Sequence, residues 1–191
     1  MPAALLPLYC TQADMEDYTG TDGMPLTLVN TQDPNYLTDP TMGPDVWMQD
    51  IMEFGWSSIP AADGPHIMHS VIRTPNTRRA AGSYTQLELL GPDFGYVYPH
   101  ASAAANGGSA HDPSLDSFGD LEMIPPYDNG DHHFPLGRIL HGSVPTRHAD
   151  VDLEDMLDAQ GIQGEVLRVD TSWLYVGHID ELVSFVPATN T

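Results

Sequence analysis

Glycine and proline interrupt this sequence so often that little room remains for a long helix. Each of the two residue types occurs 17 times in 191 residues, and both favour turns over the interior of regular elements. One stretch, residues 151–160, keeps a helical pattern: its apolar residues share one face, acids load its first turn, and Gly161 follows as a stop. The sequence therefore predicts short elements joined by turns.

Three further stretches have the composition of short strands. They are residues 66–72, 165–169 and 173–176. Strands mixed with a helix over short connections indicate a mixed α/β domain, and the chain is long enough to build one core. Residues 1–44 carry no readable chemistry and are taken as an N-terminal extension of unclear role, so the predicted domain spans residues 45–191.

The charge balance narrows the choice of partners. The chain has 27 acids against six basic residues, for a net charge of −21. Such a charge repels phosphate backbones and anionic lipid, so neither nucleic acid nor a membrane is an expected partner, whereas calcium and basic proteins are attracted. Histidines are scattered without the spacing of a transition-metal site.

The expected location is the cytoplasm. A single cysteine, Cys10, excludes an internal disulfide and is compatible with a reducing compartment. The first ten residues make a poor signal peptide, and no apolar run is long enough to span a bilayer.

Residues 47–56, WMQDIMEFGW, place polar groups in an apolar, aromatic setting. If they formed a helical turn, Gln49 and Glu53 would share one face while Asp50 pointed elsewhere. A metal on one side and a cationic substrate on the other is one interpretation, because buried carboxylates need partners. Taken alone, the stretch fits a solvated surface turn better.

A second stretch near the C-terminus, residues 172–187, reads SWLYVGHIDELVSFVP. In an extended chain His178 and Asp180 project from the same face. Taken alone, this too could be the end of a strand with a surface histidine.

Together with three other segments, these stretches resemble the calcium-dependent protein-arginine deiminases. The other segments are GPDFGYV (91–97), LDSFGDLEMIPP (115–126) and FPLGRILHGS (134–143). All five occur in the family's order with similar gaps, over roughly residues 45–187, and this makes the match specific. The resemblance implies an α/β propeller of the pentein type, built of five ββαβ modules, of which residues 45–191 cover the first half.

The resemblance assigns catalytic roles to three residues. A guanidinium is planar and charged, and carboxylates match it in bidentate geometry. Asp50 and Asp180 resemble the two carboxylates that hold its ends, and His178 resembles the general acid and base, a role that suits imidazole near neutral pH.

The family's nucleophile has no counterpart here. It is a cysteine near the C-terminus of the catalytic domain, past the point where this sequence stops. Cys10 precedes every matching segment, so it is rejected as the nucleophile and the chain alone is predicted to be inactive.

The resemblance also implies one calcium site. Its five ligands are three side chains and two backbone carbonyls: Gln49, Glu53, Glu122, Phe118 and Leu121. Such an all-oxygen set suits Ca²⁺. A second family site is expected to be lost, because Ile51 and Arg73 stand where acids are required.

Two residues are expected to contact the substrate. Trp47 precedes the catalytic Asp50 and can stack on a guanidinium, and Arg78 is the candidate for gripping the peptide backbone, with Arg79 as the alternative. Residues 115–126 are expected to make a tight turn, in which Gly119 is able to take a positive φ.

The predicted function is calcium-dependent hydrolysis of peptidyl-arginine to peptidyl-citrulline and ammonia, with arginine-containing proteins as substrates. The alternative is a catalytically inactive calcium-binding or interaction protein that keeps the deiminase scaffold. The sequence leaves the oligomeric state open.

Overall fold

The structure is a computed structural model that describes residues 33–37, 41, 45–99 and 108–185. All of these residues belong to one unit, Thr31–Thr191. Cys10 and most of the predicted extension lie outside the described residues, so the domain boundary at residue 45 stays a prediction.

The described residues form strands of three to ten residues and single helical turns, with one nine-residue α-helix. In chain order the elements are η1 (Gln49–Ile51), β1 (Met52–Ala61), β2 (Gly64–Arg73), η2 (Ala80–Ser83), η3 (Thr85–Leu89), β3 (Phe94–Val97), η4 (Gly108–Ala110), η5 (Phe118–Asp120), β4 (Leu121–Ile124), β5 (Tyr127–Asn129), β6 (His132–Phe134), β7 (Arg138–Ser143), α2 (Val151–Ala159), β8 (Leu167–Asp170) and η6 (Ile179–Glu181). The predicted mixed α/β class is confirmed.

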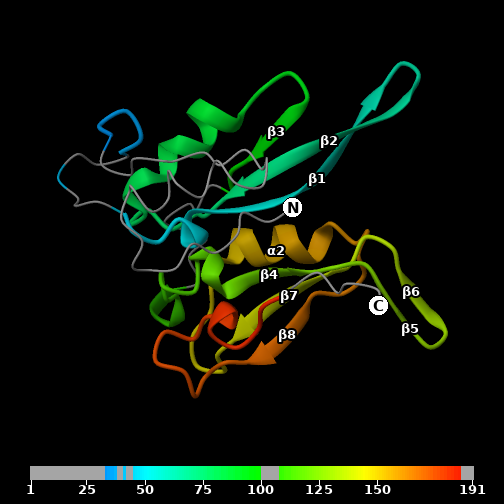
Figure 1. Cartoon of the computed structure of the whole chain (residues 1–191). Coiled ribbons are helices and arrows are strands. Elements are labelled where there is room, and N and C mark those ends of the chain that lie inside the picture. Colours follow the sequence, from blue (N-terminus) through cyan, green and yellow to red (C-terminus); the bar gives the residue numbers. More distant parts are fainter. Residues whose placement is uncertain (1–32, 38–40, 42–44, 100–107, 186–191) are drawn as a thin grey trace, which may run out of the picture. The chain divides into compact units, whose positions relative to one another are not determined.

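The first sheet has the order β1-β2-β3 (Figure 1). Strands β1 and β2 form a long antiparallel hairpin, paired from Met52↔Arg73 to Ala61↔Gly64. Strand β3 then pairs with β2 in parallel, after a connection that contains the turns η2 and η3. The strand predicted at residues 66–72 is therefore confirmed as the greater part of β2.

The second sheet repeats this order and direction with β4-β7-β8 (Figure 1). Strands β4 and β7 are antiparallel, and β8 pairs in parallel with β7 after the crossover through α2. The small hairpin β5–β6 is inserted between β4 and β7. Each sheet thus follows the ββαβ pattern, although short turns replace the helix in the first sheet. The five-module propeller stays a prediction.

Helix α2 forms where the sequence predicts it. The side chain of Asp150 accepts a hydrogen bond from the backbone N–H of Asp152 at 2.9 Å and caps the first turn. After the helix, Gly161 takes a φ of +58°, the left-handed conformation that ends helices. Both end signals are local, and for this reason the sequence locates the helix correctly.

The core lies between α2 and the second sheet. Leu153 and Leu157 on the buried face of α2 pack in one cluster with Ile139 of β7 and Leu121 of β4. Phe118, which is fully buried in η5, belongs to the same cluster. The turn that precedes β4 is therefore anchored by its own apolar side chain to the core of the second sheet.

Two strand predictions near the C-terminus need correction. The strand expected at residues 165–169 is found slightly later, as β8. Residues 173–176 are not a strand: the N–H of Leu174 bonds the carbonyl of Thr171 in a turn, and Tyr175 is 98% exposed. Their aromatic and β-branched composition favours strands, but no described strand pairs with them.

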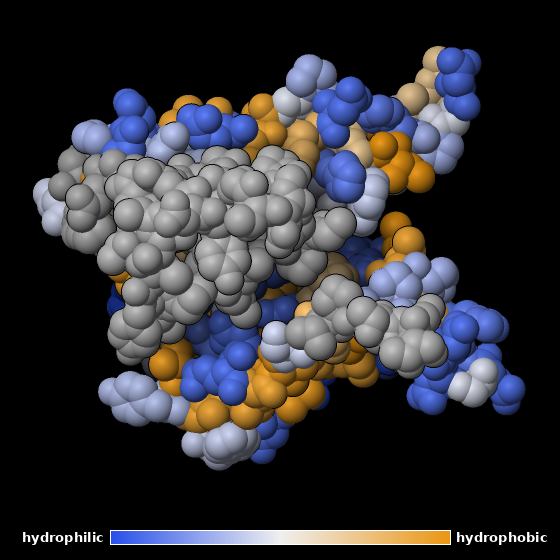
Figure 2. Space-filling view, viewed as in Figure 1, coloured by the Kyte–Doolittle hydropathy of each residue, from blue (hydrophilic) through white to orange (hydrophobic). Residues whose placement is uncertain are grey.

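Apolar side chains also reach the surface of the first sheet. On the β1–β2 hairpin these are Phe54, Trp56, Ile59 and Ile67, and Figure 2 shows hydrophobic residues at the surface of this region beside hydrophilic ones. Within the described part of the chain, no helix combines the length and the apolar character that crossing a membrane requires.

Candidate active site

Three short turns meet at the candidate site, and each carries an aspartate. They are η1 with Asp50, η5 with Asp120 and η6 with Asp180. Turn η1 runs directly into β1 and η5 directly into β4, so both occupy the same place at the start of a sheet. The fold thus brings the starts of the two sheets to one point, together with η6.

Gly119 lies at the centre of this meeting point. A Cβ added to it would stand 2.5 Å from Nδ1 of His178 and 2.7 Å from Oδ1 of Asp50. The same atom would stand 2.9 Å from Oδ2 of Asp180. The three residues predicted to be catalytic are therefore brought together, around a residue with no side chain.

The reason expected for glycine at position 119 is wrong. Gly119 is not among the glycines with a positive φ, so the turn does not require its conformational freedom. Glycine at this position leaves room instead for the side chains of His178, Asp50 and Asp180, which would crowd a Cβ.

Asp50 is buried, and both of its oxygens are engaged. Its Oδ1 accepts a hydrogen bond from the backbone N–H of Gly119 at 3.2 Å and lies 3.7 Å from Nδ1 of His178. Its Oδ2 lies 3.0 Å from Nη1 of Arg79. Backbone and side-chain donors thus hold this carboxylate in a fixed orientation.

His178 is oriented by a backbone carbonyl. Its Nε2 lies 2.7 Å from the carbonyl oxygen of Ser114, and because a carbonyl can only accept, Nε2 carries the proton in this contact. The other nitrogen, Nδ1, then faces Asp50. The side chain is buried, so its ring is held between these two neighbours.

The extended conformation expected for residues 177–180 is found only in part. His178 is extended, but Ile179–Glu181 turns into the 3-10 helix η6. Asp180 still faces the site, as its distance from the Gly119 position shows. Partial burial raises the pKa of the Asp180 carboxyl; His178 opposes this shift, and the nearby charge of Asp50 adds to it.

The predicted metal ligands lie beside this group. Gln49 and Glu53 do not share a helical turn, because η1 ends at Ile51 and Glu53 belongs to β1. Their side chains nevertheless meet, with Nε2 of Gln49 3.4 Å from Oε2 of Glu53. The side chains of Gln49 and Glu53 are therefore close, as predicted, but they do not lie on one helical turn.

Glu53 of β1 and Glu122 of β4 lie close enough for the charge of Glu122 to act on Glu53. Burial raises the pKa of Glu53 to about 8, and the charge of Glu122 adds to the shift. Burial likewise raises the pKa of Glu122 to about 7, with a contribution from Asp180. Among the described residues neither glutamate has an ion pair, so a cation bound by both carboxylates would offset the cost of burying their charge.

Phe118 and Leu121, whose carbonyls are the other predicted ligands, bracket the turn η5. The carbonyl of Phe118 accepts the N–H of Leu121, which keeps the turn closed. No three His, Cys, Asp or Glu side chains of the described part gather as a metal site by themselves. The two glutamates, the amide and the carbonyls together still make an oxygen-only donor set, which fits calcium.

The two residues predicted to contact the substrate, Trp47 and Arg78, are both exposed. Trp47 is 54% exposed, and Arg78 is exposed, with its backbone N–H bonded to the side chain of Asn76 at 2.9 Å. Arg79 differs, because its side chain reaches inward to Asp50 and to Asp45.

Asp120, which sequence reasoning did not single out, lies behind the site. It is 1% exposed, burial raises its pKa to about 8, and the N–H groups of Gly142 and Ile179 oppose that shift. A Cβ on Gly142 would collide with its Oδ1. In both Asp50-Ile51-Met52-Glu53 and Asp120-Leu121-Glu122, an aspartate is followed by apolar residues and then a glutamate. This shared pattern was the signal that could have found Asp120.

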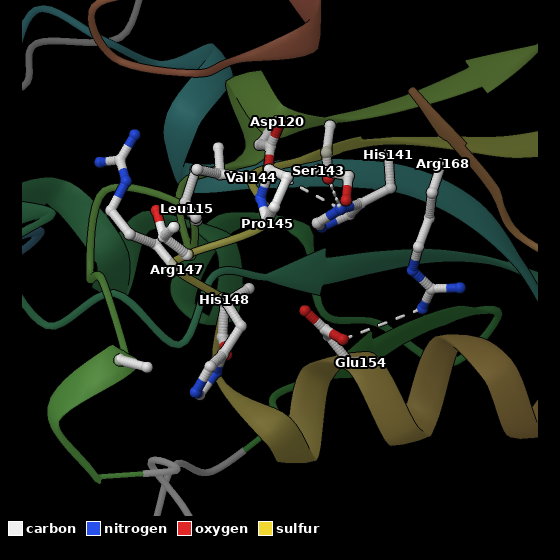
Figure 3. A pocket seen from close by; sticks show the side chains of 14 residues that line it. Leu115, Asp120, His141, Ser143, Val144, Pro145, Arg147, His148, Glu154 and Arg168 are labelled. Atoms are coloured by element: carbon white, nitrogen blue, oxygen red, sulfur yellow. Dashed lines mark hydrogen bonds and ion pairs between the residues drawn. The ribbon is translucent and has the colours of Figure 1, made fainter. Parts of the chain in front are cut away.

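A cavity of about 280 Å³ adjoins Asp120 between β7 and α2. Figure 3 shows its lining, with His141 and Ser143 from β7 near Asp120, and Glu154 of α2 facing Arg168 of β8. Burial lowers the pKa of His141 to about 4. Since the lining contains none of Asp50, His178 and Asp180, this cavity is distinct from the candidate active site.

Comparison with known proteins points to one family. A family model described as protein-arginine deiminase (PAD) matches residues 26–191. Among curated proteins, the chain is 40% identical over 151 residues to protein-arginine deiminase type-1 of Mus musculus and 39% identical over 149 residues to type-4 of Homo sapiens. It is also 39% identical, over 149 residues, to protein-arginine deiminase type-3 of Homo sapiens.

These matches cover most of this chain but little of the relatives. They take in 75–76% of the chain and only 20–21% of each relative. The chain therefore spans about a fifth of the length of the curated relatives it matches.

Proposed function

This chain belongs to the protein-arginine deiminase family, and on that premise we propose that it carries the guanidinium-binding half of a calcium-dependent deiminase site. The reaction hydrolyses peptidyl-arginine to peptidyl-citrulline and releases ammonia. The observation that carries the proposal is the convergence of Asp50, His178 and Asp180 around Gly119.

The two carboxylates bind the substrate guanidinium. Asp50 and Asp180 approach Gly119 from different turns, and two fixed carboxylates can each accept N–H groups of one planar guanidinium. Holding the cation at both ends orients its central carbon for attack, which is a positioning contribution.

His178 moves protons. With Nε2–H donated to the carbonyl of Ser114, the lone pair of Nδ1 is directed to the side on which Asp50 lies. In this position Nδ1 can take a proton from the attacking group and return it to the departing ammonia.

Calcium fits the neighbouring oxygen cluster. Gln49, Glu53 and Glu122 would bind it through their side chains, with the carbonyls of Phe118 and Leu121. The bound cation would neutralise two carboxylates whose pKa values are raised by burial. Because Glu53 follows Asp50 in the chain and Glu122 follows Gly119, binding would tighten η1 against η5.

Trp47 and Arg78 complete the proposed substrate contacts. An exposed indole beside Asp50 can stack on a guanidinium, and the exposed Arg78 can donate to peptide carbonyls. Both suit arginine within a protein chain, and the composition fits a cytoplasmic protein.

The 191-residue chain is proposed to be inactive by itself. Carboxylates and imidazole do not replace the thiolate that forms a covalent intermediate and divides the reaction into two easier steps. The sequence has one thiol, Cys10, far upstream of the matched segments. The alternative function is an inactive calcium-binding protein on the same scaffold. The observation in its support is that Arg79 already pairs with Asp50, where a substrate would bind.

Binding and turnover are tested separately. N-acetyl-arginine amide is titrated into the protein in calcium chloride, and citrulline is assayed in parallel. We expect binding that Asp50→Asn weakens at least about tenfold, equal to about 1.4 kcal/mol, and no citrulline. Unchanged binding in Asp50→Asn would overturn the assignment of the site, and citrulline formation abolished by His178→Ala would overturn the predicted inactivity.

A further inference from the structure

We propose that Arg79 is an internal competitor for the substrate: its guanidinium holds the position on Asp50 that a substrate guanidinium must take. The inference rests on the proposed function, in which Asp50 binds the substrate. In this inference, a substrate must displace the guanidinium of Arg79 from Asp50 in order to bind.

The geometry of Arg79 is that of a bound guanidinium. Its Nη1 lies 3.0 Å from Oδ2 of Asp50 and 3.3 Å from Oδ1 of Asp45. Its side chain is 19% exposed, and those of the two aspartates are 9% and 4% exposed. Such burial makes the pair stronger than an ordinary surface ion pair.

The backbone of Arg79 is fixed close to the site. Its N–H donates to the carbonyl of Asn76 at 3.2 Å, and its own carbonyl accepts the N–H of Gly82. Asn76 is in turn tied by its side-chain amide to Oγ of Ser117, directly before η5, at 2.8 Å. The side chain is therefore delivered to Asp50 by a loop that is attached to the site.

Two guanidinium groups at the same carboxylate of Asp50 would crowd and repel each other. Oδ1 accepts the N–H of Gly119 and Oδ2 pairs with Arg79, so a substrate guanidinium that pairs with Asp50 meets the guanidinium of Arg79 there. A substrate has the same planar donors and the same charge as Arg79, so the two compete on equal chemical terms.

Asp45 provides a second partner for the displaced side chain. Nη1 of Arg79 already lies within reach of this carboxylate, and Oδ1 of Asp45 also accepts the N–H of Trp47. When a substrate takes Asp50, Arg79 can keep its charge paired with Asp45. The exchange thus leaves no buried charge alone, and it links substrate entry to the segment that carries Trp47.

The affinity of N-acetyl-arginine amide tests this exchange. If Arg79 occupies Asp50 for about nine-tenths of the time, the measured affinity is reduced about tenfold. We expect Arg79→Gln to bind the probe about tenfold more tightly than the natural chain, in calcium chloride at constant ionic strength. Arg168→Gln, which removes the same charge from an exposed pair with Asp158, is the matched control and should bind like the natural chain.

A second measurement needs no variant. In spectra of the arginine Nε–Hε groups, the probe should shift the Arg79 signal and leave that of Arg168 unchanged. An unmoved Arg79 signal at saturation overturns the inference even if Arg79→Gln loses its fold.

The outcomes separate this inference from the proposed function. If Arg79→Gln binds no more tightly than the natural chain while Asp50→Asn loses the probe, Asp50 binds guanidinium but Arg79 does not compete. If Asp50→Asn binds as well as the natural chain, both the proposed function and the competition are wrong.

Discussion

Gly119 stands so close to His178 that a Cβ on the glycine would lie 2.5 Å from Nδ1 of the imidazole. The contact joins η5, at the start of the second sheet, to the segment before η6. It makes a backbone position part of the site, because the N–H of Gly119 also holds Asp50.

Gly119→Ala should damage the site while the fold survives. The new methyl group must push away His178, Asp50 and Asp180, and overpacking of this kind costs about 1–3 kcal/mol. We expect the unfolding free energy to fall by that amount and binding of N-acetyl-arginine amide to be lost. Gly55→Ala is the control, since nothing lies within 4 Å of a Cβ there; equal effects of both changes would contradict the proposed role of Gly119.

His178 should carry its proton on Nε2 when it is neutral. The acceptor next to Nε2 is the carbonyl of Ser114, 2.7 Å away, and a carbonyl cannot donate. Nitrogen-15 NMR of the imidazole distinguishes the two tautomers directly. A neutral ring protonated on Nδ1 would remove the proton acceptor that the proposed mechanism needs.

Calcium binding should release protons near neutral pH. Burial raises the pKa of Glu53 to about 8 and that of Glu122 to about 7, so below those values the folded chain holds protons that a metal must displace. We expect weaker calcium affinity at pH 6 than at pH 9, and titration enthalpies that depend on the ionisation enthalpy of the buffer.

The double substitution Glu53→Gln, Glu122→Gln should abolish both the calcium binding and the proton release. Glu165→Gln, at an exposed position, serves as control. Undiminished calcium affinity in the double variant would place the metal elsewhere.

Asp120→Asn should stabilise the protein at alkaline pH. The pKa of Asp120 is raised from 3.8 to about 8, so the folded state binds more protons than the unfolded state between these values. Its contribution to stability is present below pH 3.8 and is lost as the pH rises to 8. The lowered pKa of His141, about 4 against 6.5, acts in the opposite direction, and only below pH 6.5.

Asparagine keeps the shape of Asp120 and cannot ionise. At pH 9 we expect Asp120→Asn to raise the unfolding free energy by on the order of 1–3 kcal/mol, the cost of a buried and poorly satisfied polar group. At pH 4 the two proteins should have nearly equal stability. Denaturant unfolding at both pH values measures this, and an Asn variant less stable at pH 9 would show that the charge of Asp120 is needed.

The sequence alone determined the family, the helix α2 and the residues to examine. Helix α2 follows from signals in adjacent residues: the Asp150 cap, the apolar stripe and Gly161. Asp50, His178 and Asp180 were named because each lies inside a segment that resembles the family. Such segments are contiguous, so their meaning can be read without knowing the fold.

Strand predictions were less secure for a physical reason. Residues 173–176 have strand-like composition, yet they form an exposed turn because no described strand pairs with them. Pairing depends on a neighbour elsewhere in the chain, and composition does not contain that information.

Only the tertiary structure decided how the site is assembled. It placed η1, η5 and η6 together, gave Gly119 its role through contact rather than conformation, and directed Arg79 instead of Arg78 onto Asp50. It also supplied the N–H of Gly119 and the carbonyl of Ser114. Every residue has such backbone groups, so the identity of the side chain does not mark them; their use depends on which distant segments the packed sheets bring within hydrogen-bond distance.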